Sequence, residues 1–207
     1  MRARDLMTSP VVTVRPDAAA KEAARLLVTH GFAVLPVVDA EDRLLGVVSE
    51  ADLLRDRILP DPRELIHDRP PSPPPEPAPE VAGVMTTTVV TATPDTHAAH
   101  LGKLMVERHL RAIPVVDGDR LVGIVSRVDV LRTIARDDEA IARGVAAHLA
   151  AAGRRRWDVE VADGVVSLAC EGADETDRHV ATVVAGCTPG VVGVRIRDEV
   201  ASGAAQR

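Results

Sequence analysis

Two segments of the chain carry a serine followed three residues later by an aspartate. In both segments a pair of β-branched residues directly precedes the serine. Ser49 and Asp52 belong to the first segment, and Ser126 and Asp129 belong to the second. A buried strand that runs into Ser-x-x-Asp predicts a helix N-terminus, whose free N–H groups and partial positive charge can hold a polar, phosphorylated ligand. The same residues also form a helix cap that needs no ligand, so the spacing alone leaves both interpretations open.

The chain around these segments is duplicated. Residues 7–39 align with residues 85–117 at 14 identical positions, and residues 46–55 align with residues 123–132 at six. Hydrophobic periodicity and turn residues predict strand, helix, strand, strand and helix in both copies. In the first copy these are a strand at 11–14, a helix at 18–30, strands at 34–38 and 44–48, and a helix from 49 to about 58. Because one copy is too small to cover its own sheet, we expect the two copies to pack face to face.

The composition argues against several classes of protein. An apolar content of 46% suffices for packed cores, and a net charge of −6 argues against nucleic acid as a partner. No stretch approaches the roughly 18–20 apolar residues of a membrane-spanning helix, and no signal peptide is recognisable. Cys170 and Cys187 lack a CxxC spacing, fit a reducing compartment and are expected to be small buried residues. We therefore expect a cytoplasmic protein.

The sequence shows no catalytic or metal-binding signature. It contains no nucleophile-and-base arrangement and no phosphate-binding glycine loop, so we expect no enzyme activity, no catalytic residue and no required cofactor. His97 and His100 stand one helical turn apart, but neither His109 nor any other residue supplies a third ligand at a convincing spacing. We expect surface histidines and no metal.

The duplicated motifs resemble those of paired CBS (cystathionine-β-synthase-type) domains. The resemblance covers about residues 1–136 apart from a Pro-rich stretch, and it rests on Leu6–Thr8, Leu35–Asp39 and Gly46–Asp52 with their counterparts Val84–Thr86, Ile113–Asp117 and Gly123–Asp129. It implies an α/β (α+β) fold in which two CBS repeats pack as a pseudo-twofold pair. It also implies that adenine nucleotides or related adenosyl compounds bind in the clefts between the repeats.

The resemblance assigns roles to individual residues. Asp129 is implied to bind the ribose hydroxyls of one ligand and Ser126 its phosphate side, with the adenine against residues 4–12 of the other repeat. By pseudo-twofold symmetry, Ser49 and Asp52 serve the second cleft, with residues 82–90 opposite. The full set of implied nucleotide-binding residues is Arg4, Ser9, Val11, Val12, Pro36, Ser49, Asp52, Thr87, Val89, Val90, Pro114, Ser126, Arg127 and Asp129.

The two clefts are expected to differ in charge. The residue after the serine is Glu50 in the first copy and Arg127 in the second. A cation in the first helical turn attracts a phosphate, whereas an anion there repels one. We therefore expect the cleft built on Ser126 and Asp129 to prefer AMP, ADP or ATP, and the other cleft to be weaker or to take a less anionic adenosyl ligand.

The chain changes character after residue 136. Ile141, Val145 and Leu149 predict an amphipathic helix, residues 159–168 a hairpin with an Asp-Gly turn, and residues 176–186 a second helix. Together with the Gly-Val pattern that follows, this order resembles a BON domain over about residues 138–200. Cys170 stands where that family usually has glycine.

These observations lead to two functional hypotheses. The predicted division of the chain is CBS domain 1 at 1–59, a Pro-rich linker at 60–80, CBS domain 2 at 81–136, a small α/β BON-like domain at 137–201 and a tail at 202–207. The first hypothesis is a regulatory protein whose CBS pair binds an adenosine-containing ligand and signals through the BON-like domain. The alternative is a scaffold whose BON-like domain binds a protein partner or a phospholipid surface without nucleotide sensing. In both we expect a homodimer, with Leu101, Leu104 and Met105 contributing to the interface.

Overall fold

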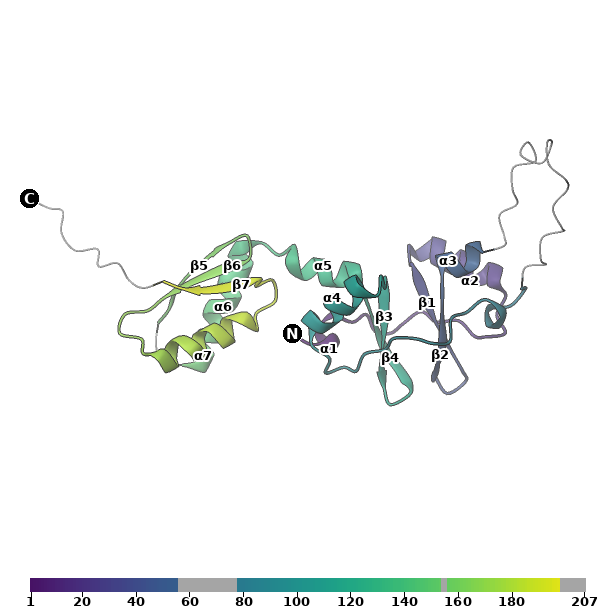
Figure 1. The fold of residues 1–207 in the computed structure, drawn as a ribbon, viewed down its shortest axis with the longest axis horizontal. Coiled ribbons are helices and arrows are strands. Elements are labelled where there is room, and N and C mark those ends of the chain that lie inside the picture. Colours follow the sequence, from purple (N-terminus) through teal and green to yellow (C-terminus); the bar gives the residue numbers. More distant parts are fainter. Residues whose placement is uncertain (56–77, 154–155, 198–207) are drawn as a thin grey trace, which may run out of the picture. The chain divides into compact units, whose positions relative to one another are not determined.

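The computed structural model describes residues 1–55, 78–153 and 156–197 of the 207 residues. The chain forms two compact units, one of residues 2–127 and one that begins at Val128 (Figure 1). The predicted Pro-rich linker lies outside the described residues up to residue 77, and so does the predicted tail. The other predicted domain boundaries stay predictions.

The first repeat has the predicted order except at its first strand. Its elements are α1 (Ala3–Leu6), α2 (Ala20–His30), β1 (Val34–Val38), β2 (Leu44–Ser49) and α3 (Glu50–Leu54). Helix α2 ends where Gly31 adopts a left-handed conformation with φ of 66°, as glycine does at helix ends. The strand expected at 11–14 is wrong, because only Val14 makes a bridge there, to Val37. In the described residues α3 ends at Leu54, before residue 58.

The second repeat reproduces the first in detail. Its elements are η2 (Val81–Gly83), α4 (Ala98–Glu107), β3 (Ala112–Asp117), β4 (Arg120–Ser126) and α5 (Arg127–Ile134). Both hairpins, β1–β2 and β3–β4, are antiparallel. Each has one irregularity in its register, after Val37 in the first hairpin and after Val115 in the second. The duplication in the sequence therefore extends to equivalent local distortions of the backbone.

The two repeats exchange their N-terminal segments, which we call arm 1 (residues 2–8) and arm 2 (residues 79–86). Arm 1 lies against the second repeat, where Thr8 exchanges two backbone hydrogen bonds with Ile124 of β4, of 2.9 and 3.2 Å. Arm 2 lies against the first repeat, where Thr86 exchanges two with Val47 of β2, of 2.8 and 2.9 Å. Because each repeat completes the other, the expected packing of the two copies against each other is confirmed.

The hairpins of the two repeats also meet at their turns. The Leu44 N–H donates to the Asp119 carbonyl at 2.9 Å, and the Leu121 N–H donates to the Asp42 carbonyl at 3.0 Å. The core of the first repeat includes Val81 of arm 2, which is fully buried among the side chains of α2, β1 and β2. Residues 2–127 are therefore one interlocked module.

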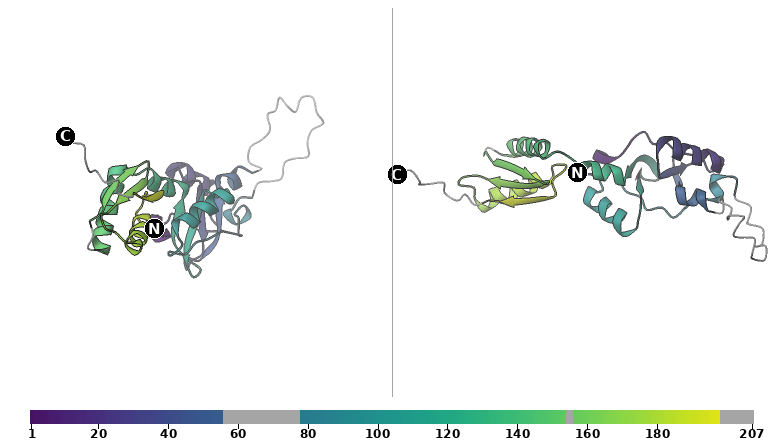
Figure 2. Two further views of the ribbon diagram at one scale, coloured as in Figure 1. Left: turned by 60° about the vertical axis from the view of Figure 1, so that its left-hand side comes forward. Right: turned by 90° about the horizontal axis from the view of Figure 1, so that it is seen from above.

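The unit after residue 127 contains a three-stranded sheet with two helices. Its further elements are α6 (Asp138–Ala152), β5 (Asp158–Ala162), β6 (Val165–Ala169), α7 (Glu175–Gly186) and β7 (Gly193–Ile196). The strand order is β5-β6-β7, with β5 antiparallel and β7 parallel to β6. Val166 and Leu168 of β6 are buried in one core with side chains of α6 and α7. Figure 2 shows the ribbon of the chain from two further sides.

Several expectations for this unit are confirmed. The predicted stripe Ile141, Val145 and Leu149 is buried on α6, and the hairpin turns at Asp163-Gly164, both with positive φ. The order α6-β5-β6-α7 is the helix, hairpin and helix that the sequence predicts, and the Gly-Val pattern that follows forms the strand β7. Among the described residues, no helix is long and apolar enough to cross a membrane.

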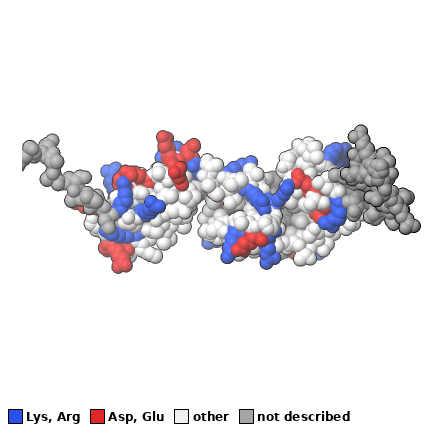
Figure 3. Space-filling view, turned by 45° about the horizontal axis from the view of Figure 1, so that its top comes forward, with Lys and Arg blue, Asp and Glu red and all other residues white. Residues whose placement is uncertain are grey.

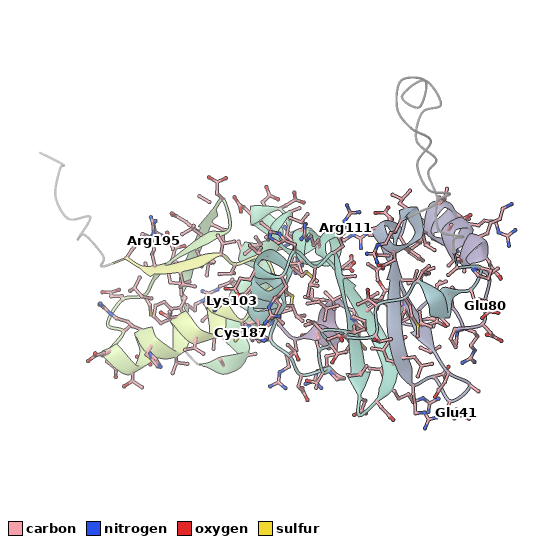
Figure 4. All side chains as sticks on the ribbon, turned by 45° about the vertical axis from the view of Figure 1, so that its right-hand side comes forward. Glu41, Glu80, Lys103, Arg111, Cys187 and Arg195 are labelled. Carbon is pink, nitrogen blue, oxygen red and sulfur yellow. The ribbon has the colours of Figure 1, made fainter. Side chains whose placement is uncertain are left out.

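Two expectations about burial are wrong. Cys187 is exposed at the end of α7, and Cys170 is only partly buried, so the thiols are not small core residues (Figure 4). Leu101 and Met105 are buried inside the second repeat and Leu104 is partly buried, so Leu101 and Met105 are core residues and not a dimer surface. The sequence pattern identified the apolar face of α4 correctly, but the repeat's own hairpin covers that face.

Candidate functional site

Ser49 and Asp52 form a complete helix cap at the start of α3. The Ser49 hydroxyl donates to Asp52 Oδ2 at 2.6 Å, and the same oxygen accepts the Ser49 N–H at 2.9 Å. In return the Asp52 N–H donates to Ser49 Oγ at 3.3 Å. Asp52 is 8% exposed, so it is one of the few buried charged residues of the described chain. The capping interpretation therefore accounts for this pair without a ligand.

The second copy places its serine and aspartate at the equivalent positions. Ser126 is the last residue of β4, and Asp129 lies in the first turn of α5. Asp129 Oδ1 accepts a hydrogen bond from Arg132 Nη1 at 2.7 Å, and its side chain is 11% exposed. Both residues make further contacts. The carboxylate of Asp129 is thus fixed by a cation on its own helix.

The exchanged arms bring part of each predicted adenine-facing segment to the strands that end at these serines. Arm 1 pairs with Ile124, two residues before Ser126, and arm 2 pairs with Val47, two residues before Ser49. The structure therefore brings Thr8 to the strand that ends at Ser126, and Thr86 to the strand that ends at Ser49. Each of these strands thus lies beside a segment of the other repeat, and the nucleotide-binding roles implied for residues 4–12 and 82–90 stay predictions.

The remaining predicted residues differ in accessibility. Ser9, Val12 and Thr87 are exposed, Val11, Val89 and Val90 are partly buried, and Pro36 and Pro114 are buried in β1 and β3. Val47, the residue opposite Pro36 in the hairpin, pairs its N–H and its carbonyl with Thr86, so the position of Pro36 needs no N–H donor.

The charged residues beside the helix starts are already paired in the structure. The Arg127 guanidinium donates to the Leu110 carbonyl at 2.7 Å and to the Met105 carbonyl at 3.1 Å, and so holds the C-terminal end of α4. Glu50 forms an ion pair with Arg111 of the other repeat (Arg111 is labelled in Figure 4). The expected charge difference between the clefts is therefore smaller than the bare sequence implies, because Arg111 offsets the charge of Glu50.

Sequence reasoning missed Arg111 and a second charged group that also joins the repeats. Arg2 and Arg4 of arm 1 both pair with Asp95 of the second repeat, Arg4 at 2.5 Å. These partners lie 61 to 93 residues apart in the chain, and only the packing of the two repeats against each other brings them together. Elsewhere charges of both signs are mixed over the face of the molecule seen in Figure 3. His97, His100 and His109 are exposed, and the described residues contain no cluster of three metal-ligating side chains.

Comparison with known proteins identifies the duplicated part. The model of the CBS domain family matches residues 3–58 and 81–136. The chain is 30% identical over 132 residues to inosine-5'-monophosphate dehydrogenase of Methanocaldococcus jannaschii, a match that covers 63% of this chain and 23% of that enzyme. The chain therefore corresponds to less than a third of the length of that relative.

Two solved structures share the fold of the duplicated part. One is CBSX2 in complex with AMP, with a TM-score of 0.52 and 29% identity, covering 63% of this chain and 93% of that one. The other is the CBS domain pair of protein MJ0100 in complex with 5-methylthioadenosine and S-adenosyl-L-methionine, with a TM-score of 0.50 and 26% identity, covering 64% and 94%. Because the family model matches both repeats, which together make up more than half of the chain, this protein belongs to the CBS domain family and carries a tandem CBS pair.

Proposed function

We propose that the CBS pair binds an adenosine-containing ligand such as AMP, ADP, ATP or S-adenosylmethionine, and that the protein is a non-enzymatic regulator. The observation that carries this proposal is the repeated arrangement in which an exchanged arm lies beside a strand that ends in Ser-x-x-Asp. Two solved CBS pairs of similar fold are complexes with adenosine compounds, which supports the same ligand class. A carboxylate that accepts both ribose hydroxyls supplies the stronger, charge-assisted kind of hydrogen bond.

The two clefts differ in what a ligand must displace. A ribose at Asp52 competes with the Ser49 N–H and hydroxyl, which both donate to the same carboxylate oxygen. Loss of such a cap destabilises a helix by about 0.5–2 kcal/mol, which would be subtracted from the binding free energy. A ribose at Asp129 would likewise displace the Arg132 guanidinium, which donates to Asp129 Oδ1 at 2.7 Å. The expectation that the cleft of Ser126 and Asp129 is the tighter one therefore keeps its original ground, the cation Arg127 in the first turn of α5.

A thermal-shift screen of the full chain against AMP, ADP, ATP, S-adenosylmethionine and NADH tests the ligand class. Binding to the folded state alone raises the unfolding temperature as the ligand concentration passes its dissociation constant. We expect at least one adenosine compound to give a saturable increase, and adenine-free ribose 5-phosphate to give none. The absence of any saturable increase would contradict the proposal.

We propose further that ligand binding is passed on to the BON-like unit that follows. Trp157, the only tryptophan, is partly buried in that unit and reports on its surroundings. If the unit responds to the CBS pair, saturating nucleotide changes the emission of Trp157 with the same concentration dependence as the thermal shift. A thermal shift without any change in Trp157 emission would contradict this step.

A homodimer and a cytoplasmic location also belong to the proposal. Val28 on α2 and Val106 on α4 occupy equivalent positions of the two repeats and are 83% and 73% exposed. Two such apolar side chains on a duplicated surface are well placed for contact with a second copy. The two free cysteines fit a reducing compartment.

The second candidate function is a scaffold without nucleotide sensing. The observation in its favour is that Val180 and Val183 are exposed on α7, 45% and 53%, one helical turn apart. An exposed apolar helix face suits a protein partner or a phospholipid surface. The test is to add anionic vesicles and to measure the emission of Trp157. If the vesicles change this emission while no nucleotide binds the chain, the scaffold function is favoured.

A further inference from the structure

The backbones of the two arms are bound in the same way. In arm 1 the Arg4 N–H donates to the Pro94 carbonyl at 3.0 Å, and in arm 2 the Ala82 N–H donates to the Pro16 carbonyl at 2.8 Å. Pro16 and Pro94 occupy equivalent positions 78 residues apart in the aligned copies. Both arms also bury one apolar side chain completely, that of Ala3 and that of Val81. Backbone pairing and apolar burial therefore do not distinguish the arms.

The charges on the two arms are not equivalent. Arg2 and Arg4 of arm 1 share the carboxylate of Asp95, which we call the Asp95 cluster. The Arg2 guanidinium hydrogen-bonded to Asp95, with Arg4 beside it, holds the pKa of that carboxyl below its usual value. All three side chains are half exposed, between 50% and 60%, so solvent and salt reach the cluster.

The equivalent positions of arm 2 carry no such cluster. By the same alignment, Arg2, Arg4 and Asp95 correspond to Glu80, Ala82 and Asp17. Glu80 (labelled in Figure 4) and Asp17 are both acidic, and neither forms an ion pair with any other residue of the described chain. Arm 2 and the repeat beneath it thus bring two like charges to the positions where arm 1 and its repeat have two cations around one anion.

We infer that the Asp95 cluster is an electrostatic fastening of arm 1 that arm 2 lacks, and that Arg2, Arg4 and Asp95 are positioning residues for the cleft of Ser126. This inference rests on the proposed function, because the proposed adenine wall, residues 4–12, begins in arm 1. Arm 1 is then held in place by charge as well as by backbone pairing, and arm 2 by backbone pairing and apolar contact alone. The consequence is a difference in salt dependence: rising ionic strength loosens arm 1 and the cleft of Ser126, and leaves arm 2 unaffected.

Hydrogen exchange of four amides in the full chain tests the fastening directly. The Arg4 and Thr8 amides report on arm 1, and the equivalent Ala82 and Thr86 amides report on arm 2. In Asp95→Asn we expect the arm 1 amides to exchange about threefold to tenfold faster, because two exposed ion pairs are lost together, with no change in arm 2. Raising the salt concentration from about 0.05 M to about 0.5 M is expected to accelerate the exchange of the same arm 1 amides in the wild-type chain. In the variant it is expected to change their exchange little further.

Two matched variants separate a fastening from general destabilisation. Asp17→Asn removes the equivalent carboxylate of the first repeat and is expected to accelerate neither arm. The double substitution Glu80→Arg with Ala82→Arg places two cations on arm 2, where they can pair with the carboxylate of Asp17. We expect it to slow the exchange of the Ala82 and Thr86 amides severalfold, and this protection to weaken as salt is added. Equal behaviour of Asp95→Asn and Asp17→Asn, or no added protection in the double variant, would overturn the inference.

Titration with AMP tests the link to the cleft. We expect the affinity of the tighter site to be about threefold to tenfold lower in Asp95→Asn, and its salt dependence to be smaller than in the wild-type chain. If AMP binds and its affinity is the same in both chains, the positioning role is wrong even where the exchange data support the fastening. If AMP and the other adenosine compounds fail to bind the wild-type chain, the proposed function fails, while the exchange data still decide whether the fastening exists.

Discussion

Two glycines show how closely the exchanged arms approach the hairpins. A Cβ added at Gly46 would lie 2.8 Å from the Thr86 carbonyl oxygen, and one at Gly123 would overlap the side chain of Met7. The first obstacle is backbone that also pairs with Val47, whereas the second is a flexible side chain. We predict that Gly46→Ala lowers the free energy of unfolding by about 1–3 kcal/mol and that Gly123→Ala costs less.

Urea unfolding of the full chain measures this difference at the residue scale. The matched control is Gly153→Ala, since a Cβ there meets nothing within 4 Å and the glycine has an extended backbone. A Gly46→Ala chain that is no less stable than the Gly153→Ala chain would show that arm 2 does not lie against β2 as described.

The candidate site was predictable from the sequence only in part. The Ser-x-x-Asp spacing identified both helix starts, because that signal is local. Residues 4–12 and 82–90 were named as the opposing segments only through the resemblance to CBS pairs. The pairing of Arg111 with Glu50 and the Asp95 cluster were not predictable. Both join side chains that are distant in the chain, and each partner alone resembles an ordinary surface charge.

At the scale of elements, one carboxylate joins a helix to a hairpin. Asp138 at the start of α6 accepts the N–H groups of Asp163 at 2.8 Å and Gly164 at 2.9 Å, the two turn residues between β5 and β6. We predict that Asp138→Ala destabilises this unit by about 1–3 kcal/mol, because two backbone donors lose a charged acceptor. Thermal unfolding followed by Trp157 fluorescence measures the effect.

The neighbouring residue supplies the control for that experiment. Glu139 is 92% exposed, and its only ion pair among the described residues is to Arg143 at 3.8 Å. We expect Glu139→Ala to unfold within a degree or two of the wild-type chain, since exposed ion pairs contribute little. Equal unfolding temperatures for the two variants would mean that Asp138 does not hold the turn.

The elements themselves followed from the sequence where the pattern was strongly periodic. The buried stripe of α6 and the Asp-Gly turn were predicted correctly, because periodicity and left-handed turn residues act locally. The strand at 11–14 was wrong although its residues favour a strand. Only Val14 of that run makes a bridge, to β1, and a β-branched run without a partner to pair with remains an extended loop.

At the scale of the whole molecule, the exposed valines predict the mode of association. Val28 and Val106 are exposed on the equivalent helices α2 and α4, whereas Leu101 and Met105 are core. We predict that Val28→Asp combined with Val106→Asp converts a homodimer to a monomer in light scattering. Val180→Asp on α7 is the control and is expected to leave the molar mass unchanged. A doubly substituted chain that retains the molar mass of a dimer would exclude this surface.

The central claim is that the CBS pair binds an adenosine compound through its second Ser-x-x-Asp segment, and calorimetric titration of AMP and of S-adenosylmethionine into the full chain tests it most directly. We predict saturable binding of at least one compound. In Asp129→Ala we expect the affinity to fall about tenfold or more, because a charged acceptor of two ribose hydroxyls is removed. The control is Asp137→Ala, which changes an exposed acid at the start of α6 and is expected to leave the affinity unchanged. No saturable heat with either compound, or Asp129→Ala binding as tightly as the wild-type chain, would contradict the account.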